Sequence, residues 1–421
     1  MDIKQILAAA IKAAAQKAID EGTVKGGELP EVLLEVPPQK EFGDFATNFA
    51  MQSARALKCN PRMIAQAVVN NLDCAYVEKM EIAGPGFINF YLKQDWMYDM
   101  LAGIIAEGEN YGNLVSDCKE KIQLEYVSAN PTGPLHVGHG RGAAVGSALA
   151  NLMKAAGMNV SREYYINDAG NQIQKFGKSL AVRYLQQFCG EEAYPLPAEC
   201  YQGGDIQVLA GEFAEINGDK YVAACSGLNE EALFASEAFE TLKNALVDYA
   251  LPKNIAALKR DLGKYRIDYD VWFHESTLHE SGAVLDVVNK LLELGACYKA
   301  EDGAIMYRSA QYAAKYGTVN KKKTEDGTEE EAKDEVLVRA NGIPTYFAAD
   351  IAYHRNKLAD RKFDKAINIW GADHHGHVAR LQAALDGLDL DGSNRLIVVL
   401  MQLVNLMQDG KPVRMSKRSG K

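Results

Sequence analysis

The chain has 421 residues, of which 48% are hydrophobic and 24% charged, and its formal net charge at pH 7 is −10. This composition predicts two to four domains with an ample core, and the acidic balance argues against a protein that coats nucleic acid through a uniformly basic surface. Because the sequence contains no run of 18 apolar residues and no signal-peptide core, we expect a cytoplasmic protein that does not enter a membrane.

The first 93 residues carry the pattern of a small α+β domain. Ile3, Leu7 and Ile11 begin a series of apolar residues four apart, which predicts an amphipathic helix that ends near Glu21. The pattern then predicts a strand at 33–36, a helix that opens at 42–47, a helix from Asn60 and two strands around the Gly84-Pro85 turn. A linking helix is expected within residues 94–118.

Residues 121–166 predict a βαβ unit. The apolar run at 122–127 favours a strand, and Pro131 and Gly133 prevent that strand from continuing. Apolar residues between 145 and 153 then recur at helical spacing, and a second extended run follows at 160–166. Units of this kind bind nucleotides, because the helix start offers free N–H groups and a positive dipole end to phosphate.

Two histidines stand three residues apart at the expected start of this helix. A helix that begins near Leu135 places the imidazoles of His136 and His139 on one face, where they can donate hydrogen bonds to phosphate oxygens. Gly138 lets a polyphosphate approach the backbone, but a dinucleotide fingerprint fits poorly because its third glycine would fall at Ala143. The order His-apolar-Gly-His resembles the HIGH signature of class I aminoacyl-tRNA synthetases, with valine where isoleucine is commonest.

The middle of the chain is predicted to be mostly helical. Apolar spacing continues from Ile173 to Phe188, a turn-rich stretch follows at 194–197, and acidic helices extend to about residue 263. His274 and His279 lie near two glutamates, so they could take part in a metal site, but a hydrogen-bonded polar surface is the more frequent outcome.

The last third predicts a second half built of strands and helices. The expected elements are a charged hairpin tip at 320–335, strands at 336–339 and 345–347, a helix at 350–358, a strand at 363–370, a helix at 378–385 and a strand at 396–403. Gly371, Asp373, His374 and His375 follow the strand at its carboxyl end, where ligands bind in open α/β sheets. Zinc is the alternative for this cluster, although adjacent histidines on a strand point apart.

The end of the chain is basic. From Lys411 onward it has five basic residues and no acidic one, which predicts a cationic loop able to clamp polyphosphate. Met415-Ser416-Lys417 resembles the KMSKS loop of class I synthetases, with arginine in place of the first lysine and of the last serine.

These motifs, with the segment from Glu125 to His139 and on through 167–173, resemble the bacterial arginyl-tRNA synthetases. Residues 41–48 and 83–89 resemble the extra N-terminal domain of that family, which contacts the tRNA elbow. The resemblance implies an α/β fold, a Rossmann-like doubly wound parallel sheet with a helical insertion, preceded by a small α+β domain. The expected domains are 1–93, a first catalytic half at 94–180, the insertion at 181–300, and a second catalytic half at 301–421 that ends in the KMSKS-type loop.

The resemblance also implies the site. Catalytic roles fall to His136, His139 and Lys417. The expected ATP-binding residues are His136, Gly138, His139, Gly371, Asp373, His374, Met415, Ser416 and Lys417. The expected arginine-binding residues are Glu125, Ser128, Asn130, His139, Tyr346 and Asp350. Glu125 is also a candidate from its chemistry, since a carboxylate in an apolar strand can pair with a guanidinium group. Asp350 has an alternative role as the cap of the helix it is expected to begin.

The expected reaction is ATP-dependent activation of L-arginine to arginyl-adenylate, followed by transfer to tRNA(Arg). Mg²⁺ is expected with ATP, and no metal is expected on the protein itself. Positioning and charge compensation account for most of the barrier reduction, so no nucleophile is needed. We expect a monomer, and we expect a helical anticodon-binding domain after the Met-Ser-Lys loop, which would make this sequence an N-terminal and catalytic piece.

Two other functions fit parts of the pattern. A tRNA- or RNA-binding relative without aminoacylation activity would keep the fold but carry damage at His136, His139 or Lys417, and all three are intact. Another nucleotidyltransferase with a His-x-Gly-His loop would lack the long insertion and the N-terminal domain. Pyrophosphate exchange with a panel of amino acids separates these alternatives.

Overall fold

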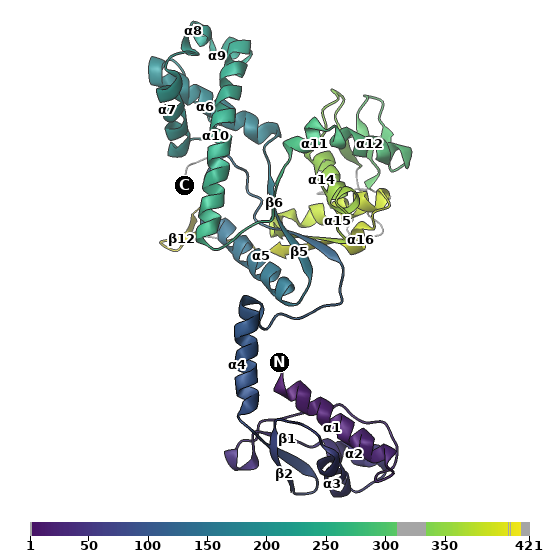
Figure 1. Cartoon of the computed structure of the whole chain (residues 1–421). Helices are drawn as coiled ribbons and strands as arrows, with labels where there is room; N and C mark the ends of the chain where they lie inside the picture. The colour runs from purple at the N-terminus through teal and green to yellow at the C-terminus, as the bar shows by residue number, and fades with distance from the viewer. Residues whose placement is uncertain (1, 310–333, 403, 405, 414–421) are drawn as a thin grey trace. The chain divides into compact units, whose positions relative to one another are not determined.

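The computed structural model describes residues 2–309, 334–402, 404 and 406–413 (Figure 1). Its contacts divide the chain into two compact units, Met1–Gly112 and Asn113–Lys421. The four-domain division expected from the sequence stays a prediction. Among the described helices, none is both long and apolar enough to cross a membrane.

The first unit packs helices against a small antiparallel sheet. Its elements are α1 (Ile3–Asp20), η1 (Lys40–Phe42), β1 (Phe45–Thr47), α2 (Phe49–Leu57), α3 (Pro61–Asn71), β2 (Val77–Ala83), β3 (Phe87–Leu92), α4 (Asp95–Glu107) and η2 (Gly108–Asn110). The strand order is β1-β3-β2. Leu7, Ile11 and Phe49 are fully buried in its core. The predicted first helix, the helix after Asn60 and the hairpin around Gly84-Pro85 are confirmed.

Two expected elements of this unit are wrong. The strand expected at 33–36 is only an isolated bridge between Glu35 and Ala46, and the segment expected to open a helix at 42–47 contains strand β1. The hydroxyl of Thr47 donates to the Leu33 carbonyl at 2.7 Å and accepts from the Phe49 N–H at 3.2 Å. This side chain therefore delays the helix until Phe49, because it satisfies a backbone donor at the helix start.

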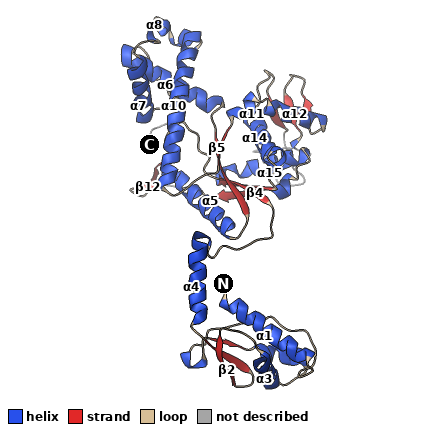
Figure 2. Cartoon of the chain, in the orientation of Figure 1, coloured by secondary structure: helices blue, strands red, loops and turns tan. Residues whose placement is uncertain are grey.

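The second unit is built on a five-stranded parallel sheet, drawn in red in Figure 2. Its strands are β4 (Lys121–Glu125), β5 (Asn159–Ile166), β6 (Val271–His274), β10 (Lys365–Gly371) and β11 (Leu396–Met401), in the order β11-β10-β4-β5-β6. Helix α5 (Val137–Ala155) connects β4 to β5, so the predicted βαβ unit is confirmed. The order reverses direction at β4, which is the switch point where ligands bind in open α/β sheets.

A group of helices follows β5. These are α6 (Gly170–Cys189), α7 (Gly204–Asn217), α8 (Val222–Cys225), α9 (Glu230–Phe234) and α10 (Glu237–Lys264), and they enclose a core of their own (Figure 1). Phe176, Tyr184 and Leu242 are fully buried in it. Strand β6 lies within the span 181–300 that was expected to be a helical insertion, yet it pairs with β5 as the edge strand of the sheet.

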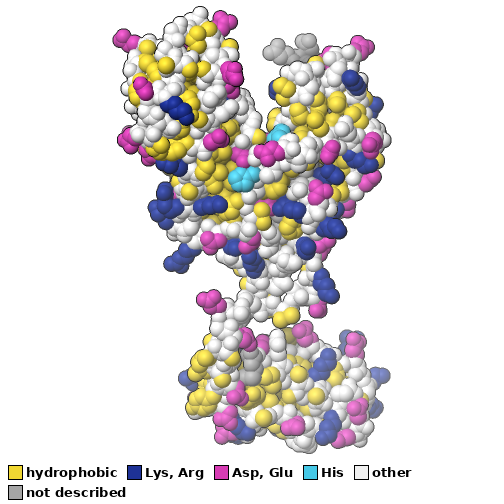
Figure 3. Space-filling model, turned by 45° about the horizontal axis from the view of Figure 1, so that its top comes forward, with side chains coloured by type: hydrophobic (Ala, Val, Ile, Leu, Met, Phe, Trp, Pro, Cys, Tyr) yellow, Lys and Arg dark blue, Asp and Glu magenta, His cyan; other side chains and the backbone are white. Residues whose placement is uncertain are grey.

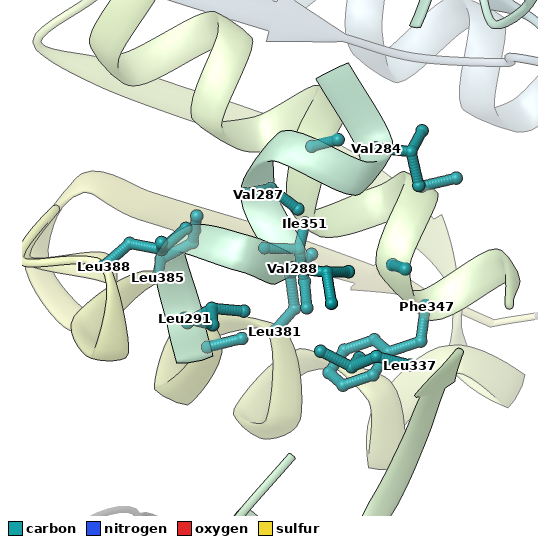
Figure 4. Close-up of a cluster of buried hydrophobic side chains, with 14 of the residues drawn as sticks. Val284, Val287, Val288, Leu291, Leu337, Phe347, Ile351, Leu381, Leu385 and Leu388 are labelled. Atoms are coloured by element: carbon teal, nitrogen blue, oxygen red, sulfur yellow. The ribbon is translucent and has the colours of Figure 1, made fainter. Parts of the chain in front are cut away.

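The remaining elements form the second half of the unit. They are α11 (Ser276–Glu280), α12 (Ala283–Glu293), β7 (Cys297–Lys299), β8 (Ile305–Tyr307), β9 (Glu335–Val338), α14 (Tyr346–Arg355), the π-helical turn η3 (Asn356–Asp360), η4 (Ala372–His374), α15 (His375–Gly387), α16 (Gly392–Arg395), β12 (Leu406–Gln408) and β13 (Lys411–Val413). Figure 4 shows the core between α12, α14 and α15, where Val287, Ile351 and Leu381 meet.

Three expectations for this half need correction. Residues 345–347 are not a strand, because α14 already begins at Tyr346, and the helix expected at 378–385 begins earlier, at His375. The cationic loop expected from Lys411 opens with strand β13, which pairs with β12. The hairpin tip expected at 320–335 lies outside the described residues except for its last two positions, because residues 310–333 are not described.

Gly146 lies where α5 crosses β4. A Cβ atom at this position would lie 2.2 Å from Cγ of Tyr126, which is inside van der Waals contact. Replacement by alanine should therefore lower the free energy of unfolding by about 1–3 kcal/mol, since the ring must move. Urea unfolding measures the change. Gly211→Ala in α7 is the matched control, because its Cβ would meet nothing within 4 Å and should stabilise the helix. Equal effects of the two changes would contradict the prediction.

Candidate active site

The chain leaves β4 through a strained turn. Val127 and Ser128 have φ values of 72° and 42°, in the left-handed region that non-glycine residues rarely adopt. The hydroxyl of Tyr164 on β5 holds the next residue, since it donates to the Ala129 carbonyl at 2.7 Å and accepts from the Ala129 N–H at 3.0 Å. The turn thereby fixes the loop that leads to the helix start.

A cavity of about 240 Å³ lies at the carboxyl ends of β4, β5 and β10, beside α14. Four predicted arginine-binding residues and two predicted ATP-binding residues line this pocket, namely Glu125, Ser128, Asn130, Asp350, Gly371 and His374. Residues that the sequence interpretation missed also line it, among them Tyr165, Tyr353, His354, Trp370 and His377. In Figure 3, histidine and acidic side chains come to the surface together where this unit is hollowed.

Asp350 projects from α14 and accepts a hydrogen bond from His377. The distance between Oδ2 of Asp350 and Nε2 of His377 is 2.8 Å. The alternative in which Asp350 caps its own helix is wrong, because α14 begins four residues earlier, after Thr345. Tyr346 opens the helix and is 71% exposed, so it does not line the pocket in this structure.

Behind the pocket, three neighbouring strands place polar residues in one row. Asn368 on β10 is in register with Glu125 on β4, which is in register with Glu163 on β5. All three are buried, with exposed fractions of 0%, 5% and 0%. Because burying a charge is costly unless it is paired, this polar row needs partners on the element that covers it.

Helix α14 and its π-helical continuation supply those partners. Lys357 donates from Nζ to Oε2 of Glu125 at 2.6 Å and to Oδ1 of Asn368 at 3.0 Å. Arg361 forms a two-pronged hydrogen-bonded pair with Glu163, whose Oε1 also accepts from the Tyr353 hydroxyl at 2.6 Å. The buried row is thus balanced by two cations from one helical face.

The balance shifts the pKa values of the buried groups. Burial alone would raise the pKa of Glu163, but the hydrogen bond from Arg361 and the charges of Lys357 and Arg361 lower it below its usual value. Burial lowers the pKa of Lys357, and the nearby carboxylates of Glu125 and Glu163 oppose that change. Burial, followed by the positive charge of Lys357, lowers the pKa of His354 well below its usual 6.5.

His354 makes stability depend on pH. Its ring is bonded on both sides, since Nδ1 donates to the Asp350 carbonyl at 2.8 Å and Nε2 accepts from Nδ2 of Asn368 at 2.7 Å. Below about pH 6.5, His354 is protonated in the unfolded chain but stays neutral in the folded chain. The free energy of unfolding therefore decreases as the pH falls. From pH 7.5 to 5.5 the free energy of unfolding should fall by about 1.4 kcal/mol through this group.

Urea unfolding at the two pH values, on the unchanged chain and on His354→Gln, measures this contribution. The glutamine cannot titrate, so the fall in stability should be smaller in the variant by about that amount. Equal falls in both proteins would show that His354 takes up its proton in the folded chain as readily as in the unfolded one.

The two histidines at the start of α5 line a second cavity, of about 410 Å³. Their rings stack with centroids 3.8 Å apart, so the predicted stacking on one helix face is confirmed. The backbone N–H of His136 donates to Nδ1 of His139 at 3.2 Å. Because that nitrogen accepts, the ring proton of His139 lies on Nε2, the nitrogen that can donate to a ligand. Gly140 and Lys264 also line this cavity.

The other predicted site residues are dispersed. Gly138 is the second residue of α5, and Asp373 lies on the exposed turn η4. His139 lines the second cavity and not the pocket that holds Glu125 and Asp350. Met415, Ser416 and Lys417 lie outside the described residues.

Neither histidine cluster forms a metal cage in the described part of the chain, where no group of three His, Cys, Asp or Glu side chains could hold a metal ion. His274 instead lies 2.7 Å from Oδ2 of Asp168, and His279 lies 3.3 Å from Oε1 of Glu275. His374 has Asp373 at 3.8 Å.

The spacing of the missed residues in the sequence could have identified them. Tyr353, His354, Lys357 and Arg361 follow the predicted Asp350 at offsets of 3, 4, 7 and 11 residues, a spacing that places all of them on one face of a helix. Polar residues also stand inside the three predicted strands at 125, 163 and 368, although each strand carries at least one other polar residue. A polar helical face opposite polar strand positions predicts a buried ionic network.

Comparison with protein families matches nearly the whole chain. The family described as "Arginyl tRNA synthetase N terminal domain" matches residues 1–92, and the one described as "tRNA synthetases class I (R), catalytic domain" matches residues 100–421.

Individual relatives agree with these matches. The arginine–tRNA ligase of Acetivibrio thermocellus is 43% identical over 421 residues, covering 100% of this chain and 69% of the relative. The arginine–tRNA ligase of Caldanaerobacter subterraneus is 46% identical over 422 residues, covering 100% of this chain and 68% of the relative. A crystal structure assigned to an arginyl-tRNA synthetase of Campylobacter jejuni superposes with a TM-score of 0.60 at 33% identity, covering 77% of this chain and 63% of that one.

Proposed function

Because the chain belongs to the arginyl-tRNA synthetases, a family of class I aminoacyl-tRNA ligases, we propose that it activates L-arginine with ATP and transfers the arginyl group to tRNA(Arg). One observation carries the choice of substrate: two carboxylates, Glu125 and Asp350, come from different halves of the unit and line one pocket at the carboxyl edge of the sheet. A guanidinium group pairs with carboxylates through two parallel charged hydrogen bonds, so such a pocket suits arginine.

In this proposal the remaining polar groups of the pocket orient the amino acid. Ser128 and Asn130 lie beside Glu125 in the pocket lining and offer short polar side chains. Tyr346, at the exposed start of α14, would close over the bound amino acid. His139, on the neighbouring cavity, would meet the carboxylate of the amino acid where it attacks ATP.

ATP would bind at the start of α5. His136, Gly138 and His139 present the helix N-terminus and the ring donors to phosphate, while Gly371, Asp373 and His374 follow β10 at the same edge of the sheet. Lys417 would add positive charge to the departing pyrophosphate, and Met415 and Ser416 would belong to the same ATP-binding loop. Mg²⁺ would accompany ATP through phosphate oxygens and water, because the described acidic residues form no cage for it.

Calorimetric titration tests the substrate. The chain should bind L-arginine but bind L-lysine and the uncharged isostere L-citrulline much more weakly, and only arginine should support ATP–pyrophosphate exchange with tRNA(Arg) present. Equal affinity for the three amino acids would contradict the proposal. A monomeric state and a cytoplasmic location stay predictions.

A further inference from the structure

We propose that Lys357 is a positioning residue for substrate recognition, one that holds the Glu125 carboxylate in place for the guanidinium group without touching the substrate itself. This inference rests on the proposed function. Lys357 is 0% exposed and does not line the pocket, whereas Glu125 does. Any effect of the lysine on a ligand must therefore pass through the groups that it contacts.

The two oxygens of Glu125 have separate tasks. Oε2 accepts from Nζ of Lys357 at 2.6 Å, on the buried side, and Oε1 accepts from the hydroxyl of Ser128 at 2.9 Å, beside the pocket. With one oxygen fixed from behind, the carboxylate cannot rotate away from the pocket. Such preorganisation spares a ligand the cost of ordering the group on binding.

Lys357 also reaches the backbone carbonyl of Asp350, through a chain of three hydrogen bonds. Nζ donates to Oδ1 of Asn368 at 3.0 Å, Nδ2 of Asn368 donates to Nε2 of His354 at 2.7 Å, and Nδ1 of His354 donates to the Asp350 carbonyl at 2.8 Å. One buried ammonium group is thus bonded directly to the Glu125 carboxylate and connected, through two side chains, to the helix backbone that carries Asp350.

The neighbouring ion pair between Glu163 and Arg361 has a structural role. Glu163 and Arg361 pair with each other and do not line the pocket, so they serve to join β5 to the helix. Lys357 lies in the π-helical turn that continues α14, and such turns occur often at functional sites.

Among Glu125, Glu163, Asp350, Lys357 and Arg361 there is one more carboxylate than cation. The group therefore suits a ligand that brings one positive charge.

Lys357→Met keeps the length of the side chain and removes its charge. We expect the Kd for L-arginine to rise roughly 10- to 100-fold, as for loss of a hydrogen bond to a charged group, while the Kd values for ATP and L-citrulline change less than about threefold. In the double variant Glu125→Gln/Lys357→Met, arginine should bind no more weakly than in Glu125→Gln alone, because the lysine then has no carboxylate to hold.

Lys243→Met is the matched control. Lys243 is also buried and donates to Glu240 at 2.6 Å, but it lies on α10 in the helical group and lines neither pocket. The Lys243→Met variant should have a lower free energy of unfolding but an unchanged Kd for L-arginine. If Lys357→Met does not fold, Asn368→Ala tests the same network and should also weaken arginine selectively.

The outcomes separate this inference from the proposed function. If the unchanged chain does not prefer arginine to citrulline, both are overturned. If it does, but Lys357→Met or its substitute weakens all ligands alike, or adds its full effect to Glu125→Gln, then only the positioning role is overturned. A selective, non-additive loss of arginine affinity supports it.

Discussion

Asp350→Ala should weaken binding of L-arginine by about 2–5 kcal/mol, roughly 30- to 5,000-fold in Kd, which is the cost of removing one partner from a desolvated charge pair. The side chain lies on a buried helix, lines the pocket and has its orientation fixed by His377 at 2.8 Å. ATP, which we place at the start of α5, should bind nearly as before. Calorimetric titration of the variant with each ligand measures both.

Asp360→Ala is the control on the same helical segment. Asp360 is exposed, lies 3.9 Å from Arg355 and does not line the pocket, so its loss should leave arginine binding unchanged. Equal losses of arginine and ATP affinity in Asp350→Ala would instead indicate that the residue supports the fold.

His139→Ala and Lys417→Ala should each lower the rate of arginyl-adenylate formation by roughly 10²- to 10³-fold, the effect of removing one preorganised donor from developing charge. Nε2 of His139 carries the ring proton because Nδ1 accepts from the His136 backbone. The affinity for ATP in the ground state should change less, since these donors act mainly on the transition state.

ATP–pyrophosphate exchange in the presence of tRNA measures the rates, with His279→Ala and Lys290→Ala as controls. Both control residues lie on the second unit, and neither lines either of the two pockets. Rates near that of the unchanged chain in either His139→Ala or Lys417→Ala would remove that residue from the proposed mechanism.

Local patterns predicted the βαβ unit because its signals are local. The apolar run before Pro131, the glycines after it and the helical spacing from Val145 all act within 35 residues of each other. Glu125 also stands out in the sequence as a carboxylate in an apolar strand, and the structure places it in the pocket lining. What could not be predicted was its partner, because pairing of β10 with β4 joins segments more than 200 residues apart.

Two further errors have local causes. Strand β6 is four residues long between helices, too short for an alternating pattern to stand out, so it was assigned to the insertion. Tyr346 was assigned to a strand because aromatic residues favour strands, but packing of Phe347 and Ile351 into the core outweighs that propensity and begins the helix there.

The polar row of Asn368, Glu125 and Glu163 also bears on the order in which the protein is made. Glu125 and Glu163 stand opposite each other on paired strands, and their cations follow 232 and 198 residues later in the chain. Like charges placed opposite each other weaken strand pairing. On the ribosome, the first half of the sheet therefore emerges with two uncompensated carboxylates, and it gains its full stability only when the last third of the chain has been synthesised and α14 has docked.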